Sequence, residues 1–140
     1  MKLEKNFMRN ADLGLLLLRL TVGGLMLFHG IHKVTNGVGG IGEMLAAIGL
    51  PAFIAYGSLL AEVVASLMMI VGVWTRAASA VFAGNMVVAI MMAHSADIFT
   101  VNAMTGGWTI ELPMLYLLGS AVLCLTGAGK YAVTRGGVFD

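Results

Sequence analysis

Two ionisable side chains interrupt long apolar runs of this chain, and they are the first candidates for chemistry. Arg19 lies inside the run Leu13–Lys33, and Glu62 lies inside the next long apolar run. A charge near the middle of a membrane-spanning helix costs about 2.5–3.5 kcal/mol on insertion scales, so each group needs a partner within the protein. Successive spans run antiparallel, which places Arg19 about 9 Å and Glu62 about 18 Å from the same side of the membrane. Because the extended arginine side chain can close most of that gap, we expect Arg19 and Glu62 to form a buried ion pair.

A second set of polar side chains belongs to the opposite ends of the same runs. Lys33 closes the first run, His94 closes the third, and Glu111 opens the fourth. We expect Glu111 to pair with Lys33 or with His29, which lies one helical turn before Lys33. Asn85, in the middle of the third run, can form hydrogen bonds across a helix bundle.

Histidine spacing raises the question of a metal or a haem. His29 and His32 have the spacing of half a metal site, and His94 could complete it or could hold a haem together with His29. No ligand motif accompanies these residues, and histidines at a membrane interface are commonly satisfied by water and headgroups. We therefore expect no metal and no haem. The single cysteine, Cys124, excludes an intramolecular disulfide, a CxxC pair and a four-thiolate zinc site.

The composition is that of a membrane protein. Hydrophobic residues make up 59% of the chain and charged residues only 11%, against about 25% charged residues in a soluble domain. The mean hydropathy of +0.94 agrees. The net charge is +1 and no basic stripe is present, so nucleic acid is not an expected partner.

Four apolar runs are long enough to cross a bilayer as helices, which predicts an all-α, integral membrane four-helix bundle. Their expected bounds are about 13–33, 52–74, 77–95 and 108–126. Residues 34–51 form an outer loop with a short amphipathic patch at Glu43–Ile48. We expect residues 1–140 to be one membrane domain.

Lysine and arginine residues are distributed unequally between the two sides of this predicted bundle. One side carries Lys2, Lys5, Arg9, Arg76, Lys130 and Arg135, and the other carries only Lys33. Because loops rich in Lys and Arg stay in the cytoplasm, we expect a multi-pass protein of the bacterial inner membrane with both termini in the cytoplasm.

The order and spacing of these residues resemble those of a known family. The residues that carry the likeness are Arg19, Gly23, the segment Phe28–Lys33, Gly49–Pro51, Glu62, Gly72, Thr75, Arg76, Ala89, Glu111 and Thr126–Gly129. Over about residues 13–131 the chain resembles the DoxX family of small bacterial membrane proteins. It departs from the family pattern at Tyr131–Arg135, where members often have a serine and an aspartate.

The resemblance implies a four-helix inner-membrane bundle linked to respiratory or sulfur redox systems. Some relatives are the membrane subunit of thiosulfate:quinone oxidoreductase, and others associate with oxidative-stress proteins. The sequence offers no redox centre of its own, so electron transfer would need a bound quinone, a cofactor or a partner subunit. Whether the chain is an enzyme stays open, and a non-autonomous subunit of a membrane oxidoreductase is one form it could take.

Three functions compete at this point. The first is a subunit that binds a quinone or similar lipophilic molecule for a partner oxidoreductase. In it, Arg19 holds an oxygen, Glu62 orients Arg19 or carries a proton, and His29 and Glu111 relay protons. The second is a small-solute transporter, which would need a homo-oligomer or a very small solute. The third is a non-catalytic scaffold whose charges only fix helix register.

Overall fold

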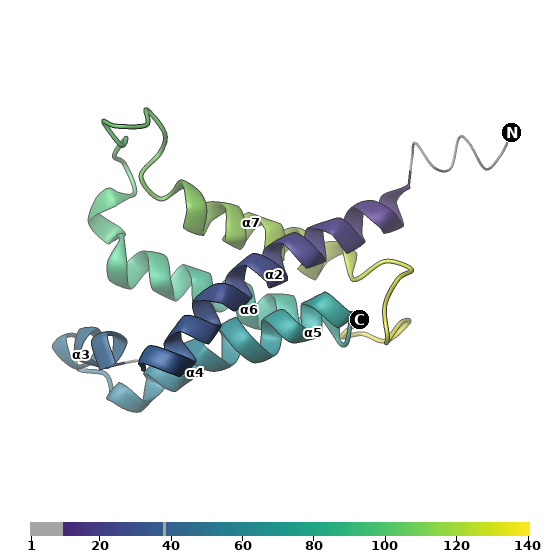
Figure 1. Cartoon of the computed structure of the whole chain (residues 1–140), viewed down its shortest axis with the longest axis horizontal. Helices are drawn as coiled ribbons and strands as arrows, with labels where there is room; N and C mark the ends of the chain where they lie inside the picture. The colour runs from purple at the N-terminus through teal and green to yellow at the C-terminus, as the bar shows by residue number, and fades with distance from the viewer. Residues whose placement is uncertain (1–9, 38) are drawn as a thin grey trace, which may run out of the picture.

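The computed structural model describes residues 10–37 and 39–140, and this part of the chain is helical, without a β-strand. Three regular helices, α2 (Ala11–Asn36), α6 (Thr75–Ala93) and α7 (Glu111–Thr126), lie alongside one another with a fourth, irregular helix between Ala52 and Val71 (Figure 1). The expected all-α membrane bundle is confirmed.

Helix α2 is longer than the sequence indicated, at 26 residues instead of the expected 13–33. It starts early because the Asn10 side chain accepts a hydrogen bond from the Leu13 amide at 3.0 Å, which caps the free N–H groups of the first turn. It ends where Gly37 adopts a φ of 83°. At about 1.5 Å per residue it spans about 39 Å.

The second helix is not regular. It begins as the 3₁₀ turn η1 (Ala52–Ile54), continues as α4 (Ala55–Leu60), widens into the π-helical segment η2 (Ala61–Ala65) and closes as α5 (Ser66–Val71). It ends before the expected Trp74 because Gly72 takes a left-handed conformation, with a φ of 80°. The π-helical segment contains Glu62, and such segments occur frequently at functional sites.

The connections between the long helices contain short helical segments of their own, and two helix bounds differ from those expected. The short helix α3 (Gly39–Ala47) occupies the expected outer loop, and the 3₁₀ turn η3 (Ser95–Asp97) follows α6. Helix α6 begins and ends two residues earlier than expected. Helix α7 begins at Glu111 instead of residue 108, because Trp108 belongs to the preceding loop, where it forms an isolated bridge with Val101.

Three of the helical segments are long and apolar enough to cross a membrane. They are Ala11–Asn36, Ala52–Val71 and Thr75–Ala93. Helix α7 is apolar but has only 16 residues, or about 24 Å of length against about 30 Å of hydrocarbon. The fourth crossing thus remains a prediction, with a shorter helix than the sequence indicated.

Two glycines on the buried face of α2 let it approach the second helix closely. A Cβ at Gly23 would lie 2.9 Å from the Ser66 carbonyl oxygen, and one at Gly30 would lie 3.0 Å from the Glu62 carbonyl oxygen. The absence of a side chain at these two positions therefore permits close helix packing. The contacts also fix the level at which α2 meets the π-helical segment.

Candidate functional site

Arg19 is fully buried but does not pair with Glu62. Its Nε and Nη2 atoms donate to the Met69 and Ile70 carbonyl oxygens at 2.8 and 2.9 Å, at the end of α5. Its Nη1 atom donates to the carbonyl oxygens of Ala128 and Tyr131 at 3.0 and 2.6 Å. The Arg19–Glu62 ion pair predicted from the sequence is therefore wrong.

The physical reason is that α5 presents unsatisfied carbonyls where Arg19 meets it. The last carbonyls of a helix lack intrahelical donors and carry the negative end of its dipole. A guanidinium has five N–H donors in a rigid planar fork, so it can reach several carbonyls at once. Arg19 thus neutralises the end of α5 and fastens the C-terminal segment, Gly127–Asp140, to it.

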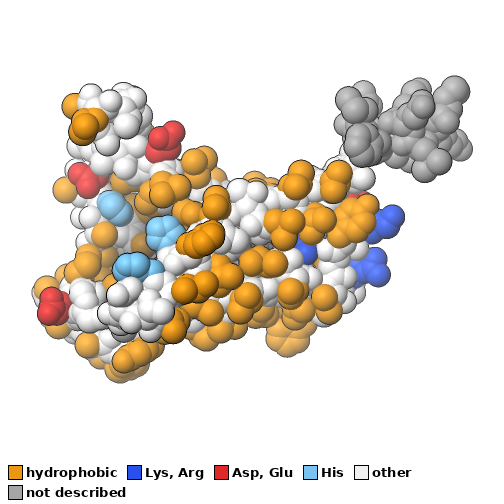
Figure 2. Space-filling view, in the orientation of Figure 1, with side chains coloured by type: hydrophobic (Ala, Val, Ile, Leu, Met, Phe, Trp, Pro, Cys, Tyr) orange, Lys and Arg blue, Asp and Glu red, His pale blue; other side chains and the backbone are white. Residues whose placement is uncertain are grey.

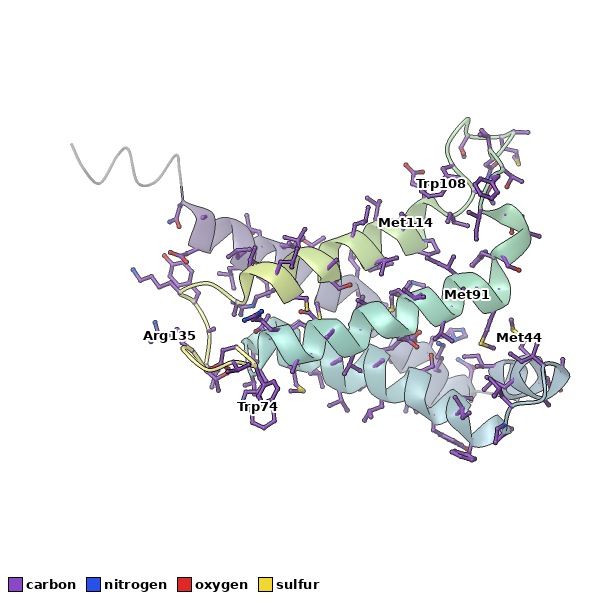
Figure 3. The ribbon with its side chains drawn as sticks, turned by 180° about the vertical axis from the view of Figure 1, so that it is seen from behind. Met44, Trp74, Met91, Trp108, Met114 and Arg135 are labelled. Atoms are coloured by element: carbon purple, nitrogen blue, oxygen red, sulfur yellow. The ribbon has the colours of Figure 1, made fainter. Side chains whose placement is uncertain are left out.

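The C-terminal segment closes this end of the bundle through its own backbone as well. The amide of Thr134 donates to the Gly72 carbonyl at 3.1 Å, and its hydroxyl accepts from the Trp74 amide at 2.9 Å. The amides of Arg76 and Ala77, at the start of α6, donate to the Phe139 carbonyl at 3.0 and 3.2 Å. Figure 3 shows Trp74 and Arg135 together at this end of the molecule.

Glu62 pairs with Lys33. The Nζ atom of Lys33 lies 2.6 Å from Oε1 of Glu62 and 3.0 Å from the Ser58 hydroxyl. The Ser58 hydroxyl also lies 3.4 Å from Oε1 of Glu62. The Glu62 side chain is 8% exposed and that of Lys33 is 23% exposed. Oε2 of Glu62 is buried and has no hydrogen-bond partner within the described residues.

An apolar cavity of about 390 Å³ lies beside this ion pair, within the usual range for small-molecule sites. Its walls come from α3, the start of the second helix and one face of α6. Its polar lining residues are Lys33 and Ser58 on one side and Asn85 on the α6 side. Figure 3 shows Met44, another lining residue, on α3 beside the end of α6.

The remaining predicted site residues do not join this cluster. The Glu111 side chain is exposed, so its predicted pairing with Lys33 or His29 is wrong: Lys33 is engaged by Glu62, and His29 packs edge-on against the Tyr116 ring at 6.2 Å. His94 faces Asp97, with Nδ1 and Oδ2 separated by 3.8 Å. Among residues 10–37 and 39–140, no three His, Cys, Asp or Glu side chains are placed to hold a metal ion.

The spacing of Ser58 is a signal that it shares the face of Glu62, although Ser58 was not among the site residues predicted from the sequence. Ser58 precedes Glu62 by one helical turn and so shares its face. The π-helical segment gave no such signal, because Ala61–Ala65 contains, apart from Glu62, only alanine and valine. The carbonyl partners of Arg19 were also not visible, since a backbone acceptor leaves no mark in the residue types.

These features define an all-helical membrane protein with a buried ion pair beside an apolar cavity. The DoxX family profile matches residues 14–95. The chain is also similar to a protein named "Putative oxidoreductase CatD" from Bacillus subtilis (strain 168), with 32% identity over 120 residues, covering 86% of this chain and 84% of that protein. No solved structure matches.

The chain belongs to the DoxX family, as the residue pattern indicated. The matched region, residues 14–95, contains Arg19, both members of the Lys33–Glu62 pair and every residue that lines the cavity. Ala128 and Tyr131, the residues of the C-terminal segment whose carbonyls accept hydrogen bonds from Arg19, lie outside the matched region.

Proposed function

We propose that this protein is a membrane subunit that binds a quinone, or a similar lipophilic carbonyl compound, in the cavity beside Lys33 and serves a partner oxidoreductase. The observation that carries the proposal is a largely apolar cavity with an ammonium group at its edge. An apolar wall suits a lipophilic ring, and a few polar groups fix its orientation. The name of the Bacillus subtilis relative is consistent with redox work.

Lys33 replaces Arg19 as the group that holds the ligand oxygen. An ammonium group has three N–H donors, and two of those of Lys33 are engaged by Glu62 and Ser58. The third has no partner among the described residues, so it can donate to a ring carbonyl in the cavity that Lys33 lines. All four hydrogen bonds of Arg19 are made to backbone carbonyls at the far end of the bundle, so it is not a candidate for this role.

Glu62 acts on the ligand through Lys33. Its carboxylate holds the ammonium group at the cavity edge and balances its charge, which would otherwise be costly inside the bundle. Asn85 lies on the α6 wall and can donate to or accept from a second polar group of the ligand. Electrons would come from the partner subunit.

The transport alternative receives less support from the geometry. It relied on a polar column from Arg19 to Lys33, but the C-terminal segment closes the Arg19 end by backbone hydrogen bonds. The scaffold alternative agrees with the structural role of Arg19, but it gives no account of the cavity.

Cavity-filling substitution tests the proposal without touching the ion pair. Gly84 lines the cavity, and a Cβ there would meet nothing within 4 Å. Gly84→Leu should fold normally and abolish retention of quinone by the protein extracted in native lipid, measured by native mass spectrometry. Gly24→Leu is the matched control, because Gly24 is also helical, has the same open space and lies outside the cavity.

Charge substitution gives an independent test. Lys33→Met should weaken quinone binding, whereas Lys130→Met makes the same chemical change at an exposed site at the other end and should leave binding unchanged. Unaltered quinone affinity in both Gly84→Leu and Lys33→Met, in folded protein, would refute the proposed site.

We further propose that both termini lie in the cytoplasm and that the membrane is the bacterial inner membrane. Arg76, Lys130 and Arg135 belong to the end that carries the C-terminal segment, and Figure 2 shows Lys and Arg side chains gathered there, with His side chains at the opposite end. A C-terminal fusion should be active with a cytoplasmic fluorescent reporter and inactive with alkaline phosphatase. The reverse result would show that the C-terminus lies on the other side of the membrane, and the proposed orientation would be wrong.

A further inference from the structure

The loop between α6 and α7, residues 98–110, has a fixed shape. The Asn102 amide donates to the Gly107 carbonyl and the Gly106 amide donates to the Asn102 carbonyl, both at 2.8 Å. The Thr109 amide donates to the Thr100 carbonyl at 3.2 Å. Gly106 has a φ of 73°, which glycine adopts without strain. The loop is thus a small hairpin-like unit.

Several polar side chains of this loop are bonded within the loop itself. The Thr100 and Thr109 hydroxyls are 2.8 Å apart, and the indole N–H of Trp108 donates to the Ile98 carbonyl at 2.6 Å. The Asn102 side chain accepts from the Met104 amide at 2.9 Å. Burying a polar group costs most when it has no partner. This loop can therefore leave water at a reduced cost.

Large apolar side chains project from the same loop. Phe99 is 97% exposed, Met104 is 95% exposed and Val101 is 67% exposed. None of residues 98–110 is charged. A loop that bonds several of its own polar groups and presents exposed, uncharged apolar side chains is suited to an apolar phase.

We propose that the tip of this loop inserts into the lipid bilayer at the membrane interface. The loop joins two apolar helices, and Figure 1 shows it at the end of the bundle, displaced sideways from the helices. Met91 on α6 and Leu112 on α7, the helices that the loop joins, are also exposed apolar residues, as expected of side chains that face lipid. Because the loop carries no charge, it can enter the bilayer without the large cost of removing an ion from water.

The insertion gives the protein a second anchor outside its helices. Aromatic residues favour the headgroup level of a bilayer, and Trp108 lies at the base of the loop with its N–H already satisfied. Anchored in this way, the loop fixes the level of the start of α7, the shortest of the bundle helices. The loop lies outside residues 14–95, so the family match does not account for it.

Spin labelling tests this inference. With Cys124→Ser removing the native thiol, Met104→Cys introduces a label at a side chain that is almost fully exposed, so the fold should not change. Arg135→Cys, also exposed and at the opposite end, is the control. Both proteins are reconstituted in vesicles that contain no other protein, and collisions of the label with oxygen and with a water-soluble nickel complex are measured.

We expect the ratio of oxygen to nickel collision rates to be several-fold higher at position 104 than at position 135. Introducing Phe99→Asp into the Met104→Cys protein should shift that ratio towards the value at position 135, because a carboxylate resists entry into lipid. Equal ratios at 104 and 135 would overturn the inference and leave the tip in water, where it would be open to a protein partner.

Discussion

Double-mutant cycles can decide which buried charges interact. Two cycles share the substitution Glu62→Gln, one with Lys33→Met and the other with Arg19→Met. The ion-pair distance of 2.6 Å predicts strong coupling in the first cycle. The hydrogen bonds of Arg19 to backbone carbonyls predict independence in the second.

The magnitudes follow from burial. Removing one member of a buried ion pair costs about 3–5 kcal/mol, because the other charge is left unpaired, whereas removing both members is often close to neutral. Lys33→Met should therefore be severe, and adding Glu62→Gln should restore much of the loss, with a coupling energy of at least about 2 kcal/mol. Lys33 is 23% exposed, which places the effect towards the lower end of the range.

Arg19→Met should be equally severe but should not be rescued. It leaves carbonyls at the end of α5 and in the C-terminal segment without donors, and Glu62 is unrelated to them. Substitutions without shared partners are additive within about 0.3–0.5 kcal/mol. Arg19→Lys should also be destabilising, since a single ammonium nitrogen cannot reproduce the planar fork.

The assay is reversible unfolding in mixed micelles of increasing denaturing-detergent content, followed by circular dichroism. The free energy of unfolding is compared for the parent, the single variants and the double variants. A coupling above about 1 kcal/mol between Arg19 and Glu62, with none between Lys33 and Glu62, would refute the assignment and favour the pairing predicted from the sequence.

Three further outcomes can be checked by the same unfolding assay. Gly30→Ala should cost about 1–3 kcal/mol of stability, because its Cβ would lie 2.7 Å from Cγ2 of Val63 and 3.0 Å from the Glu62 carbonyl oxygen. Gly24→Ala is the control and should be neutral or slightly stabilising, because its Cβ would have open space around it. Equal losses of stability in the two variants would refute the close approach of the helices at Gly30. Glu111→Gln should change stability by less than about 0.5 kcal/mol, because the side chain is exposed, and a larger loss would point to an ion pair. Deleting residues 132–140 should destabilise the protein by removing the bonds that Thr134 and Phe139 make to the ends of α5 and α6, and unchanged stability would show that this closure contributes nothing.

The sequence was sufficient for the membrane bundle because length and hydropathy are properties of single segments. The segments Ala11–Asn36, Ala52–Val71 and Thr75–Ala93 are close to the spans expected from those two properties. Local conformation was harder to obtain. No residue type within Ala61–Ala65 marks the change to π-helical geometry.

The predicted pairing of Arg19 with Glu62 was wrong for a different reason, which is that the sequence pattern does not determine the register between two helices. Apolar stripes repeat every three to four residues, so they orient two helices face to face but leave their relative sliding open. The structure sets Arg19 against Ile70, Gly23 against Ser66 and Gly30 against Glu62. In this register Arg19 reaches the end of α5, and Glu62 lies about two helical turns away from it.

The glycines carry the information that would have fixed this register. At Gly23 and Gly30 on α2, the backbone of the second helix comes within 3.0 Å of the place that a Cβ would occupy. Glycine pairs on one helix face mark where a neighbouring backbone approaches most closely. Placing Gly30 at the level of Glu62 brings Lys33, one turn further on, to the side of Glu62 and Ser58 next to the cavity. The same placement leaves Arg19 at the carbonyls of α5. One helix register therefore places Lys33 at the cavity and Arg19 where it bonds α5 to the C-terminal segment.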